Sequence, residues 1–412
     1  MKYRLISFKD FTRPGGGNIR IIGILNELIK AGKTVEVHGF HEDIPGLLPE
    51  AQVHLLPTRL QQLNKRKFQL ALAFLPAGLT KMLFGWVLQT FSTYFSEKNV
   101  TNSTFVFPEH LDNSLGYFLN KHRLIHGYIN DIHGIAPIEF MAKKEYSFLR
   151  NLIFFFKRYA AVRLDNKVFQ HAKGFLFPSP GVQKYFTSKY KLDDKIQLLV
   201  PEAANQILLE QEVDEALQEE VRSQCGLLEA DTVILFAGAF KPTGGVLDLL
   251  HAFVQLKQSG APTSKLVLIG KGSDWQAAQD IVREAGLQDA VRFLGMVPYE
   301  KLYTYQSLAD IIVCPDKFSA YSDLLPHIKY YDALASGKIV INGRFTCLEA
   351  MNAGERFSLE FIPSDVASLS ATLKRAVEQK TALMDKYSTN REKVKQAYTY
   401  TQSVQSMLSE FS

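Results

Sequence analysis

The chain of 412 residues contains 46% hydrophobic and 22% charged residues, which is typical of a globular protein with two or three domains. Its three cysteines show no CxxC or Cys–His spacing, which excludes a disulfide scaffold and predicts the reduced thiols of a cytoplasmic protein. The net charge of +5 is uneven, because residues 1–200 carry 27 Lys and Arg against 15 Asp and Glu, whereas residues 201–412 carry 20 against 27. The basic first half is therefore expected to face an anionic partner, either nucleic acid or an acidic membrane surface.

The first half begins with a predicted strand, a glycine-rich loop and a helix. Residues 3–8 alternate as a strand does, and the N-terminal segment lacks the long apolar run of a signal peptide. Apolar residues at helical spacing predict a helix over 19–31, closed by Gly32. A second strand is predicted at 34–40. Later strands of this half are expected at 104–108, 126–130 and 174–178.

Residues 70–95 form a long apolar segment with Lys81 as its single charged residue. About 20 apolar residues can span a bilayer, so a transmembrane helix is one interpretation. Pro76, Gly78 and Lys81 interrupt the segment, which favours a buried or interfacial helical hairpin instead.

Residues 142–173 are predicted to form a helix with a basic face. Lys143, Arg150 and Lys157 recur every seven residues and therefore share one side of the helix. The apolar residues of the opposite side are Leu149, Leu152, Ile153 and Phe156. Together with the apolar segment 70–95, this helix predicts peripheral binding to an anionic membrane surface on the cytoplasmic side.

The second half begins with an acidic connection and then repeats the alternation of strands and helices. Between residues 202 and 231, nine carboxylates are opposed only by Arg222, which marks the connection into a second domain. Apolar strands are predicted at 233–238, 265–270, 291–295, 311–315 and 338–342, with helices between them. The alternation predicts an α/β protein with two parallel sheets in series, and hence two Rossmann-like domains.

Candidate ligand-binding residues follow the predicted strands of the first half. The loop at 15–17 is all glycine, which lets backbone N–H groups approach a phosphate at the start of a helix. It does not match GxGxxG, because Arg20 stands where the third glycine would be, and a simple strand-to-helix turn remains the alternative. Asp131 and His133 follow another predicted strand, and ligands of open α/β sheets lie beyond the carboxyl ends of strands.

In the second half, Lys241 and Lys271 each follow a glycine-containing strand end. Two converging lysines suit a diphosphate, and the alternative is a pair of solvated loop lysines. Lys329 and Asp332 are one helical turn apart, and residues 321–323 precede the same helix, whose N-terminus favours a phosphate. The chain contains no Asp-x-Asp pair of the kind that holds a metal ion on a diphosphate, so no metal is expected.

Taken together, these motifs resemble those of glycosyltransferase family 4, and the resemblance covers most of the chain. The similar segments are V-x-F-L-G-x-V at 291–297, LADIIVCP at 308–315 and KYYDALASGKIV at 329–340. In the first half, the glycine-rich loop and the Asp-x-His-Gly segment at 131–134 are also similar. The resemblance implies a GT-B fold, in which two Rossmann-like parallel-sheet domains face a central cleft.

The resemblance also implies a role for each part of the chain. Residues 1–200 would form an acceptor-binding domain, residues 201–388 a nucleotide-sugar-binding domain, and residues 389–412 a helix crossing back to the first domain. His133, Asp323 and Asp332 are the implied catalytic residues, with Asp332 bonding the ribose hydroxyls. The implied donor-binding residues are Gly16, Gly17, Gly238, Lys241, Gly244, Gly270, Lys271, Val297, Tyr321, Ser322, Leu324, Lys329 and Asp332. The expected activity is transfer of a sugar to a glycan or lipid-linked acceptor, with retention and without a cofactor, because the nucleotide-sugar is a substrate.

Three positions depart from the family pattern. The first glutamate of the family's carboxylate pair falls on Leu324, and the residues that clamp the diphosphate fall on Ala239 and Gly244. These departures leave open a non-catalytic scaffold partner of another glycosyltransferase. A sugar-nucleotide epimerase would need an acid/base pair that the sequence does not show. A nucleic-acid-binding protein would carry an RRM, KH or helix-turn-helix signature, and none is present, so nucleic acid is not an expected partner.

Overall fold

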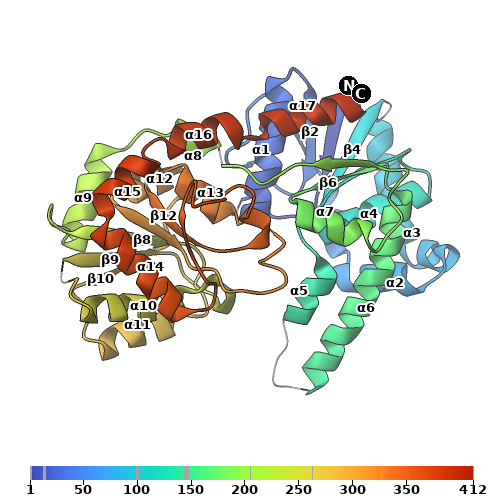
Figure 1. The fold of residues 1–412 in the computed structure, drawn as a ribbon. Helices are drawn as coiled ribbons and strands as arrows, with labels where there is room; N and C mark the ends of the chain where they lie inside the picture. Colours follow the sequence, from blue (N-terminus) through green and yellow to red (C-terminus); the bar gives the residue numbers. More distant parts are fainter. Residues whose placement is uncertain are drawn as a thin grey trace. The chain divides into compact units, whose positions relative to one another are not determined.

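The computed structural model describes residues 2–12, 15–98, 100, 102–142, 148–204, 206–261, 263–325 and 327–411. The chain divides into two compact units (Figure 1). The first consists of Met1–Pro201 with Tyr400–Ser412, and the second of Glu202–Thr399.

The first unit is built on a seven-stranded parallel sheet of order β3-β2-β1-β4-β5-β6-β7. Its strands are β1 (Lys2–Ile6), β2 (Thr34–Gly39), β3 (Gln52–Leu55), β4 (Ser103–Pro108), β5 (Ile129–Asp131), β6 (Gly174–Phe177) and β7 (Ile196–Leu199). Its helices before residue 200 are α1 (Gly16–Lys30), η1 (Thr58–Gln62), α2 (Lys65–Phe74), α3 (Ala77–Lys98), α4 (Glu109–Lys121), α5 (Ala136–Ala142), α6 (Phe148–His171) and α7 (Pro180–Thr187). The central strands are buried on both faces, as expected of a parallel sheet covered by helices.

The last helix, α17 (Tyr400–Phe411), belongs to the first unit and packs against α1 and β7. The Tyr400 ring lies over Gly23, where a Cβ would come within 2.5 Å of it, and Thr401 Oγ1 donates to Glu27 Oε2 at 2.7 Å. The preceding helix α16 (Asn390–Ala397) packs on α13 (Ile328–Leu334) and lies in the second unit. The boundary therefore falls between residues 399 and 400, later than the boundary at 389 expected from sequence.

The second unit contains a six-stranded parallel sheet of order β10-β9-β8-β11-β12-β13. Its strands are β8 (Thr232–Ala237), β9 (Ser264–Ile269), β10 (Val291–Gly295), β11 (Ile311–Cys314), β12 (Ile339–Gly343) and β13 (Leu359–Phe361). Its further helices are α8 (Gln206–Glu210), α9 (Glu215–Cys225), η2 (Pro242–Gly244), α10 (Val246–Gln258), α11 (Trp275–Glu284), η3 (Tyr299–Lys301), α12 (Leu302–Ser307), η4 (Thr346–Leu348), α14 (Val366–Glu378) and α15 (Lys380–Tyr387).

Alternate residues of β8 enter two different apolar cores. Ile234 and Phe236 pack with residues of α10 and α14, whereas Val233 and Leu235 pack with residues of α9 and α13. Helices thus cover both faces of the second sheet, which is the arrangement of a Rossmann-like domain. The predicted fold class, an α/β protein with two Rossmann-like parallel-sheet domains, is confirmed.

The apolar segment 70–95 forms the end of α2 and most of α3, and the helical path breaks at Leu75 and Pro76. The part of the chain that the structure describes contains no helix long and apolar enough to cross a membrane. Of the predicted basic face, Lys143 and the side chain of Arg150 lie outside the described residues. The side chain of Leu149, predicted for the opposite side of the helix, also lies outside them.

Candidate functional site

The first sheet reverses its strand order between β1 and β4, and ligands of open α/β sheets bind at such a switch point. Lys9 lies in the loop after β1, and Glu109 follows β4 directly. Lys9 Nζ and Glu109 Oε1 form an ion pair across the switch point. Glu109 has a backbone φ of 60°, a left-handed conformation that is strained for a residue with a side chain. Such strain is typically found where a side chain must point in one particular direction.

Beside this ion pair lies a buried chain of three side chains. Arg20 Nε and Nη2 donate to Asp131 Oδ1 at 3.0 and 2.9 Å, and Arg20 Nη1 donates to the carbonyl of Val200 at 2.7 Å. The other oxygen, Asp131 Oδ2, lies 2.6 Å from His133 Nε2. Although burial alone would raise the pKa of Asp131, the Arg20 guanidinium and His133 hold that pKa below its ordinary value.

Gly17 lies against these groups at the start of α1. A Cβ on Gly17 would stand 2.5 Å from Lys9 Nζ, 2.9 Å from His133 Nδ1 and 3.1 Å from Glu109 Oε1. The structure thus brings the two predicted residues Gly17 and His133 together, with Gly16 as the first residue of α1. Lys9 and Glu109 are absent from the sequence-predicted set, and their position directly after predicted strands is the signal that points to them.

The second sheet reverses its strand order between β8 and β11. The loop after β8 is joined to the loop after β9, because Phe240 N donates to the carbonyl of Lys271 at 3.1 Å. Only glycine fits at positions 270 and 245. A Cβ on Gly270 would lie 1.9 Å from the carbonyl oxygen of Gly238, and a Cβ on Gly245 would lie 1.7 Å from the carbonyl oxygen of Pro315. Both residues also have positive φ angles, 127° and 72°.

These close contacts place two predicted lysines on neighbouring loops. The side chains of Lys241 and Lys271 are exposed, and the Lys271 ammonium lies 5.6 Å from the centre of the Trp275 ring. Gly238 and Gly244 lie in the same loop as Lys241, and Gly244 is buried. Val297, which follows β10, is half-buried and packs on the apolar core.

A second buried chain lies between β11 and α13. Asp316 Oδ1 accepts from Lys329 Nζ at 2.8 Å, and Asp316 Oδ2 lies 2.8 Å from His327 Nδ1. Burial opposes ionisation of Asp316, but the Lys329 ammonium and His327 hold its pKa below the ordinary value. Asp316 and His327 are absent from the sequence-predicted set, whereas Lys329 is in it.

Asp332 lies one turn after Lys329 on α13 and is buried. Its Oδ2 accepts a hydrogen bond of 3.0 Å from Tyr299 Oη. Lys329 is therefore tied to the loop that follows β11, at the switch point of the second sheet, whereas Asp332 is bonded to η3, which follows β10.

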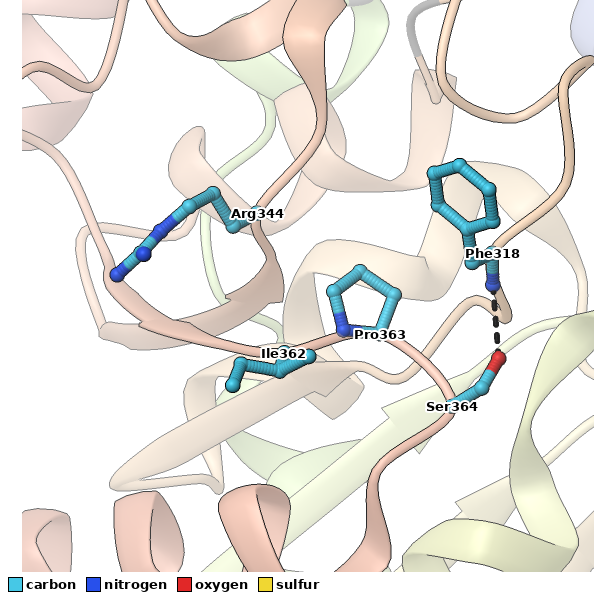
Figure 2. Close-up of a pocket in the computed structure, with 5 residues that line it drawn as sticks. All are labelled: Phe318, Arg344, Ile362, Pro363 and Ser364. Carbon is cyan, nitrogen blue, oxygen red and sulfur yellow. Dashed lines mark hydrogen bonds between the residues drawn. The ribbon is translucent and has the colours of Figure 1, made fainter.

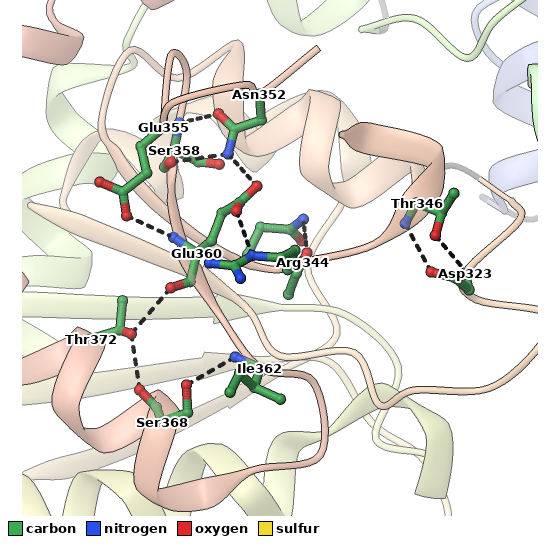
Figure 3. A network of polar contacts seen from close by, with 12 residues as sticks. Asp323, Arg344, Thr346, Asn352, Glu355, Ser358, Glu360, Ile362, Ser368 and Thr372 are labelled. Atoms are coloured by element: carbon green, nitrogen blue, oxygen red, sulfur yellow. Dashed lines mark hydrogen bonds and ion pairs between the residues drawn. The ribbon is translucent and has the colours of Figure 1, made fainter. Parts of the chain in front are cut away.

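The loop before α13 contains the predicted residues Tyr321, Ser322, Asp323 and Leu324. Ser322 Oγ accepts from Ser319 N at 2.8 Å and closes a turn within this loop. Both carboxylate oxygens of Asp323 are engaged by Thr346, through its backbone N–H at 2.8 Å and its hydroxyl at 2.9 Å (Figure 3). Asp323 thus ties the loop after β11 to the loop after β12. Tyr321 and Leu324 are half-buried in the same loop.

A pocket of about 600 Å³ opens among the loops that follow β11, β12 and β13 (Figure 2). Its lining residues are Phe318, Arg344, Ile362, Pro363 and Ser364. The Arg344 guanidinium is paired with Glu360, which also accepts from Asn352 (Figure 3). None of these residues was predicted, since no motif marks them. Among the residues that the structure describes, no group of three or more His, Cys, Asp or Glu could hold a metal ion.

Comparison with known proteins agrees with this architecture. Residues 217–394 match the family model described as glycosyl transferases group 1. A curated relative, lipopolysaccharide 1,2-N-acetylglucosaminetransferase of Salmonella typhimurium, is 28% identical over 133 residues, which are 30% of this chain. The match spans 33% of the length of that relative.

Solved structures match over the whole chain. Sucrose-phosphate synthase of Thermosynechococcus elongatus has a TM-score of 0.73 and 18% identity, with 100% of this chain and 98% of that one covered. HepE of Anabaena, in complex with UDP and glucose, has a TM-score of 0.70 and 16% identity, with 99% of each chain covered. The fold is therefore that of the GT-B glycosyltransferases, and the family match supports the group 1 glycosyltransferase superfamily.

Proposed function

We propose that the protein is a retaining glycosyltransferase of family 4 that transfers a sugar from a nucleotide-sugar to a glycan or lipid-linked acceptor, without a metal ion. The proposal is carried by the Lys329–Asp332 pair beside the glycine-rich loops at the switch point of the second sheet. Its place would be the biosynthesis of a cell-surface polysaccharide or glycolipid. The lipopolysaccharide transferase among the relatives supports this placement.

The donor would bind the second unit through two kinds of group. Asp332 would accept hydrogen bonds from the two vicinal ribose hydroxyls of a nucleotide, since a carboxylate has two oxygens with several lone pairs. The ammonium groups of Lys241, Lys271 and Lys329 would stabilise the negative charge of the departing diphosphate. HepE, which shares the fold, has been solved with UDP and glucose.

A thermal-shift panel of UDP-glucose, UDP-galactose, UDP-N-acetylglucosamine and GDP-mannose tests the proposal. A ligand at 100 times its dissociation constant stabilises the folded state by about 2.7 kcal/mol, which is a readily measured rise in Tm. We expect at least one compound to raise the Tm of the wild type and not that of Asp332→Ala. If none of the four raises it, the protein is the scaffold partner that Leu324, Ala239 and Gly244 suggest.

We further propose that the first unit lies on an anionic membrane surface at the cytoplasmic face. Large apolar side chains are exposed on three helices, α2, α3 and α6. They are Leu70, Phe74, Leu79, Met82, Leu83, Leu152, Ile153, Phe155, Phe156, Tyr159 and Val162. We call these residues the apolar face. Helices α2 and α6 pack side by side, and α3 continues directly from α2 (Figure 1).

Basic side chains are interleaved with this apolar face. The Arg163 guanidinium lies 5.5 Å from the centre of the Phe74 ring, which is itself 5.8 Å from Tyr159. Lys81, Arg158 and Arg163 are exposed. Exposed aromatic and aliphatic side chains beside cations suit the interface of an anionic bilayer, where each basic residue contributes about 1 kcal/mol.

Vesicle sedimentation across a salt series tests this placement. We expect binding to anionic vesicles that weakens with salt, because added ions screen the basic residues. The double variant Phe155→Ser/Phe156→Ser should reduce binding to anionic vesicles. Leu228→Ser is the matched control, since Leu228 is 67% exposed in the second unit. Equal, negligible binding to anionic and neutral vesicles would contradict the proposal.

A further inference from the structure

The pocket of the second unit contains none of the residues proposed to bind the donor (Figure 2). It lies where three neighbouring parallel strands end, and its lining residues are Phe318 after β11, Arg344 after β12, and Ile362, Pro363 and Ser364 after β13. Small-molecule sites have volumes of about 300–1,000 Å³, and this pocket, with about 600 Å³, falls within that range. The pocket is therefore large enough for a ligand of its own.

Two exposed apolar side chains of the pocket are carried by backbone that hydrogen bonds hold in place. Phe318 is 59% exposed and Ile362 is 57% exposed. Phe318 N donates to Ser364 Oγ at 2.9 Å, and Ile362 N donates to Ser368 Oγ at 2.9 Å. Because the backbone is fixed at both positions, a ligand that packs on these side chains has less disorder to overcome when it binds.

Ser364 has a strained backbone conformation. Its φ is 66°, in the left-handed region that is unfavourable for a residue with a side chain. A glycine would relieve the strain, but it would lack the hydroxyl that accepts the hydrogen bond from Phe318 N. Backbone strain of this kind is typically found at binding sites, where it holds a neighbouring group in one position.

The polar part of the pocket is the Arg344 guanidinium. Arg344 Nε donates to Glu360 Oε2 at 3.0 Å, and Glu360 Oε1 accepts from Asn352 Nδ2 at 2.9 Å (Figure 3). Within the part of the chain that the structure describes, the two terminal nitrogens of Arg344 donate to no protein group, and the side chain is 69% exposed. Figure 2 shows this side chain extending to the same side as Ile362, which follows the neighbouring strand.

These features together suit an uncharged sugar ring. A pyranose ring has C–H groups on its faces, which pack on apolar side chains, and hydroxyl groups around its edge, which accept hydrogen bonds from a guanidinium. The carboxylate of Glu360 balances the charge of Arg344, so the pocket has little attraction for a phosphate. A purely apolar chain would cover the terminal N–H groups of Arg344 and leave them unpaired.

We propose that this pocket binds an uncharged sugar residue of an oligosaccharide, with Phe318 and Ile362 packed against the ring and Arg344 bonded to its hydroxyl groups. Asp316, which pairs with Lys329, lies in the same loop after β11 as Phe318, so the pocket and the proposed donor site share that loop. In the proposed function the oligosaccharide is the glycan acceptor, and the pocket holds a sugar of that glycan other than the one that reacts. This role rests on the proposed function, whereas the binding of an oligosaccharide does not.

NMR of the protein labelled with 13C in the δ1 methyl groups of isoleucine tests the binding. Ile362→Val removes the resonance of Ile362 and so assigns it. We expect at least one of maltotriose, cellotriose, chitotriose and mannotriose to shift this resonance in a saturable manner. If none of the four trisaccharides shifts it, the proposal is overturned, and a shift with inorganic phosphate instead would assign the pocket to an anion.

Two variants and two controls connect the shift to the pocket. Phe318→Ala and Arg344→Gln should each weaken the affinity for the trisaccharide about tenfold or more, since each removes a direct contact with the sugar. Arg283→Gln is the matched control for Arg344→Gln, because Arg283 is 65% exposed and pairs with Asp280 on α11. Leu228→Ala is the control for Phe318→Ala, since Leu228 is 67% exposed. Affinities in the two pocket variants equal to those of their controls contradict the proposal.

Ser364→Gly tests whether the strained residue positions Phe318. Glycine adopts a positive φ without strain, so this variant should have a Tm no lower than the wild type, but it should bind the trisaccharide more weakly because Phe318 N loses its acceptor. Ser364→Asn should restore part of the affinity, since asparagine tolerates a positive φ and carries an acceptor oxygen. Wild-type affinity in Ser364→Gly would show that Ser364 does not position the ring.

The nucleotide site and the pocket are tested separately. A trisaccharide that shifts Ile362 should do so equally in Asp332→Ala, because Asp332 lies on α13 and is not among the residues that line the pocket. If no nucleotide-sugar raises the Tm of the wild type, the proposed function fails, while the trisaccharide titration still decides the binding proposal. In transfer assays Arg344→Gln should raise the KM for an oligosaccharide acceptor about tenfold and leave the dissociation constant of the nucleotide-sugar unchanged. An acceptor KM equal to that of Arg283→Gln removes the pocket from the acceptor site.

Discussion

A buried carboxyl group lies at the switch point of each sheet, and the pKa values of the two groups are shifted in opposite directions. Behind the first, Asp112 of α4 lies 2.5 Å from Ser7 Oγ and accepts from Phe8 N at 3.0 Å, and burial raises its pKa to about 7. Behind the second, Asp316 is paired with Lys329 and His327, and its pKa lies below the ordinary value. The loops at a switch point can thus be fixed through a carboxyl that is about half protonated near pH 7 or through ion pairs.

The difference extends to the groups that face a ligand. At the first switch point, Lys9 and Glu109 neutralise each other, which suits an uncharged hydroxyl-bearing group. At the second, Lys241 and Lys271 are exposed on adjoining loops, which suits the two negative charges of a diphosphate.

Removing the ion-paired carboxylate of the second switch point should have the largest effect. Asp316→Ala leaves Lys329 and His327 without their buried partner, and we expect a loss of about 3–5 kcal/mol in the free energy of unfolding. Asp248→Ala is the control, because Asp248 pairs with the partly exposed Lys317 and should cost less than about 1 kcal/mol. Urea unfolding of both variants measures the difference. Equal losses would show that the Asp316 pairs contribute no more than a surface ion pair.

Asp332→Ala should weaken the nucleotide-sugar binding proposed for the second switch point while leaving the fold intact. Loss of the hydrogen bonds that two ribose hydroxyls donate to one carboxylate should weaken nucleotide-sugar affinity by about 3 kcal/mol, or roughly 100-fold. Asp332→Glu should be tolerated, and Tyr299→Phe should bind within a few-fold of the wild type because the carboxylate remains. Calorimetric titration gives the affinities. Wild-type transfer activity in Asp332→Ala would falsify the assignment and leave Asp332 as a structural residue of α13.

Lys241→Ala and Lys271→Ala should each weaken binding of UDP by about 1.5–3 kcal/mol, the range of a hydrogen bond to a charged group. Lys265→Ala is a matched control, since Lys265 lies near the amino end of β9, whose carboxyl end leads to Lys271. Calorimetry with UDP separates the three variants. If Lys241→Ala and Lys271→Ala bind like Lys265→Ala, both lysines are merely solvated.

The sequence predicts the interior of this fold better than its edges. Buried strands such as β8 and β11 are nearly continuous apolar runs, and this pattern predicts them directly. The strands β3, β7 and β13 were not predicted, because β3 and β7 are partly exposed edge strands and β13 has three residues. The boundary between residues 399 and 400 depends on α16 packing against α13, which helical periodicity cannot reveal.

The residues of the candidate site likewise fall into two groups, those that a local motif predicts and those that it does not. His133 and Lys329 lie in local motifs and were predicted, whereas Arg20 reaches Asp131 across 111 positions of the chain and Lys9 reaches Glu109 across 100. Such pairs arise from the order of strands in the sheet, which a single sequence does not specify. Asp323 lies in a motif that predicts a catalytic role. In the structure both of its carboxylate oxygens accept hydrogen bonds from Thr346, a contact that the motif does not predict.

The smallest expected effect concerns pH and distinguishes the two switch points directly. The folded-state pKa of Asp112 is raised to about 7, so its contribution to stability is fully present below the unfolded value and is lost as pH rises through 7. Between pH 6 and 8 the wild type should lose about 1.4 kcal/mol relative to Asp112→Asn, which keeps the shape of the side chain but does not ionise. Urea unfolding at pH 6, 7 and 8 measures this difference. The pKa of Asp316 is lowered, so its contribution is lost only in acid, as pH falls below the unfolded value. Parallel pH profiles for the wild type and Asp112→Asn would mean that both switch points are held by ionised carboxylates.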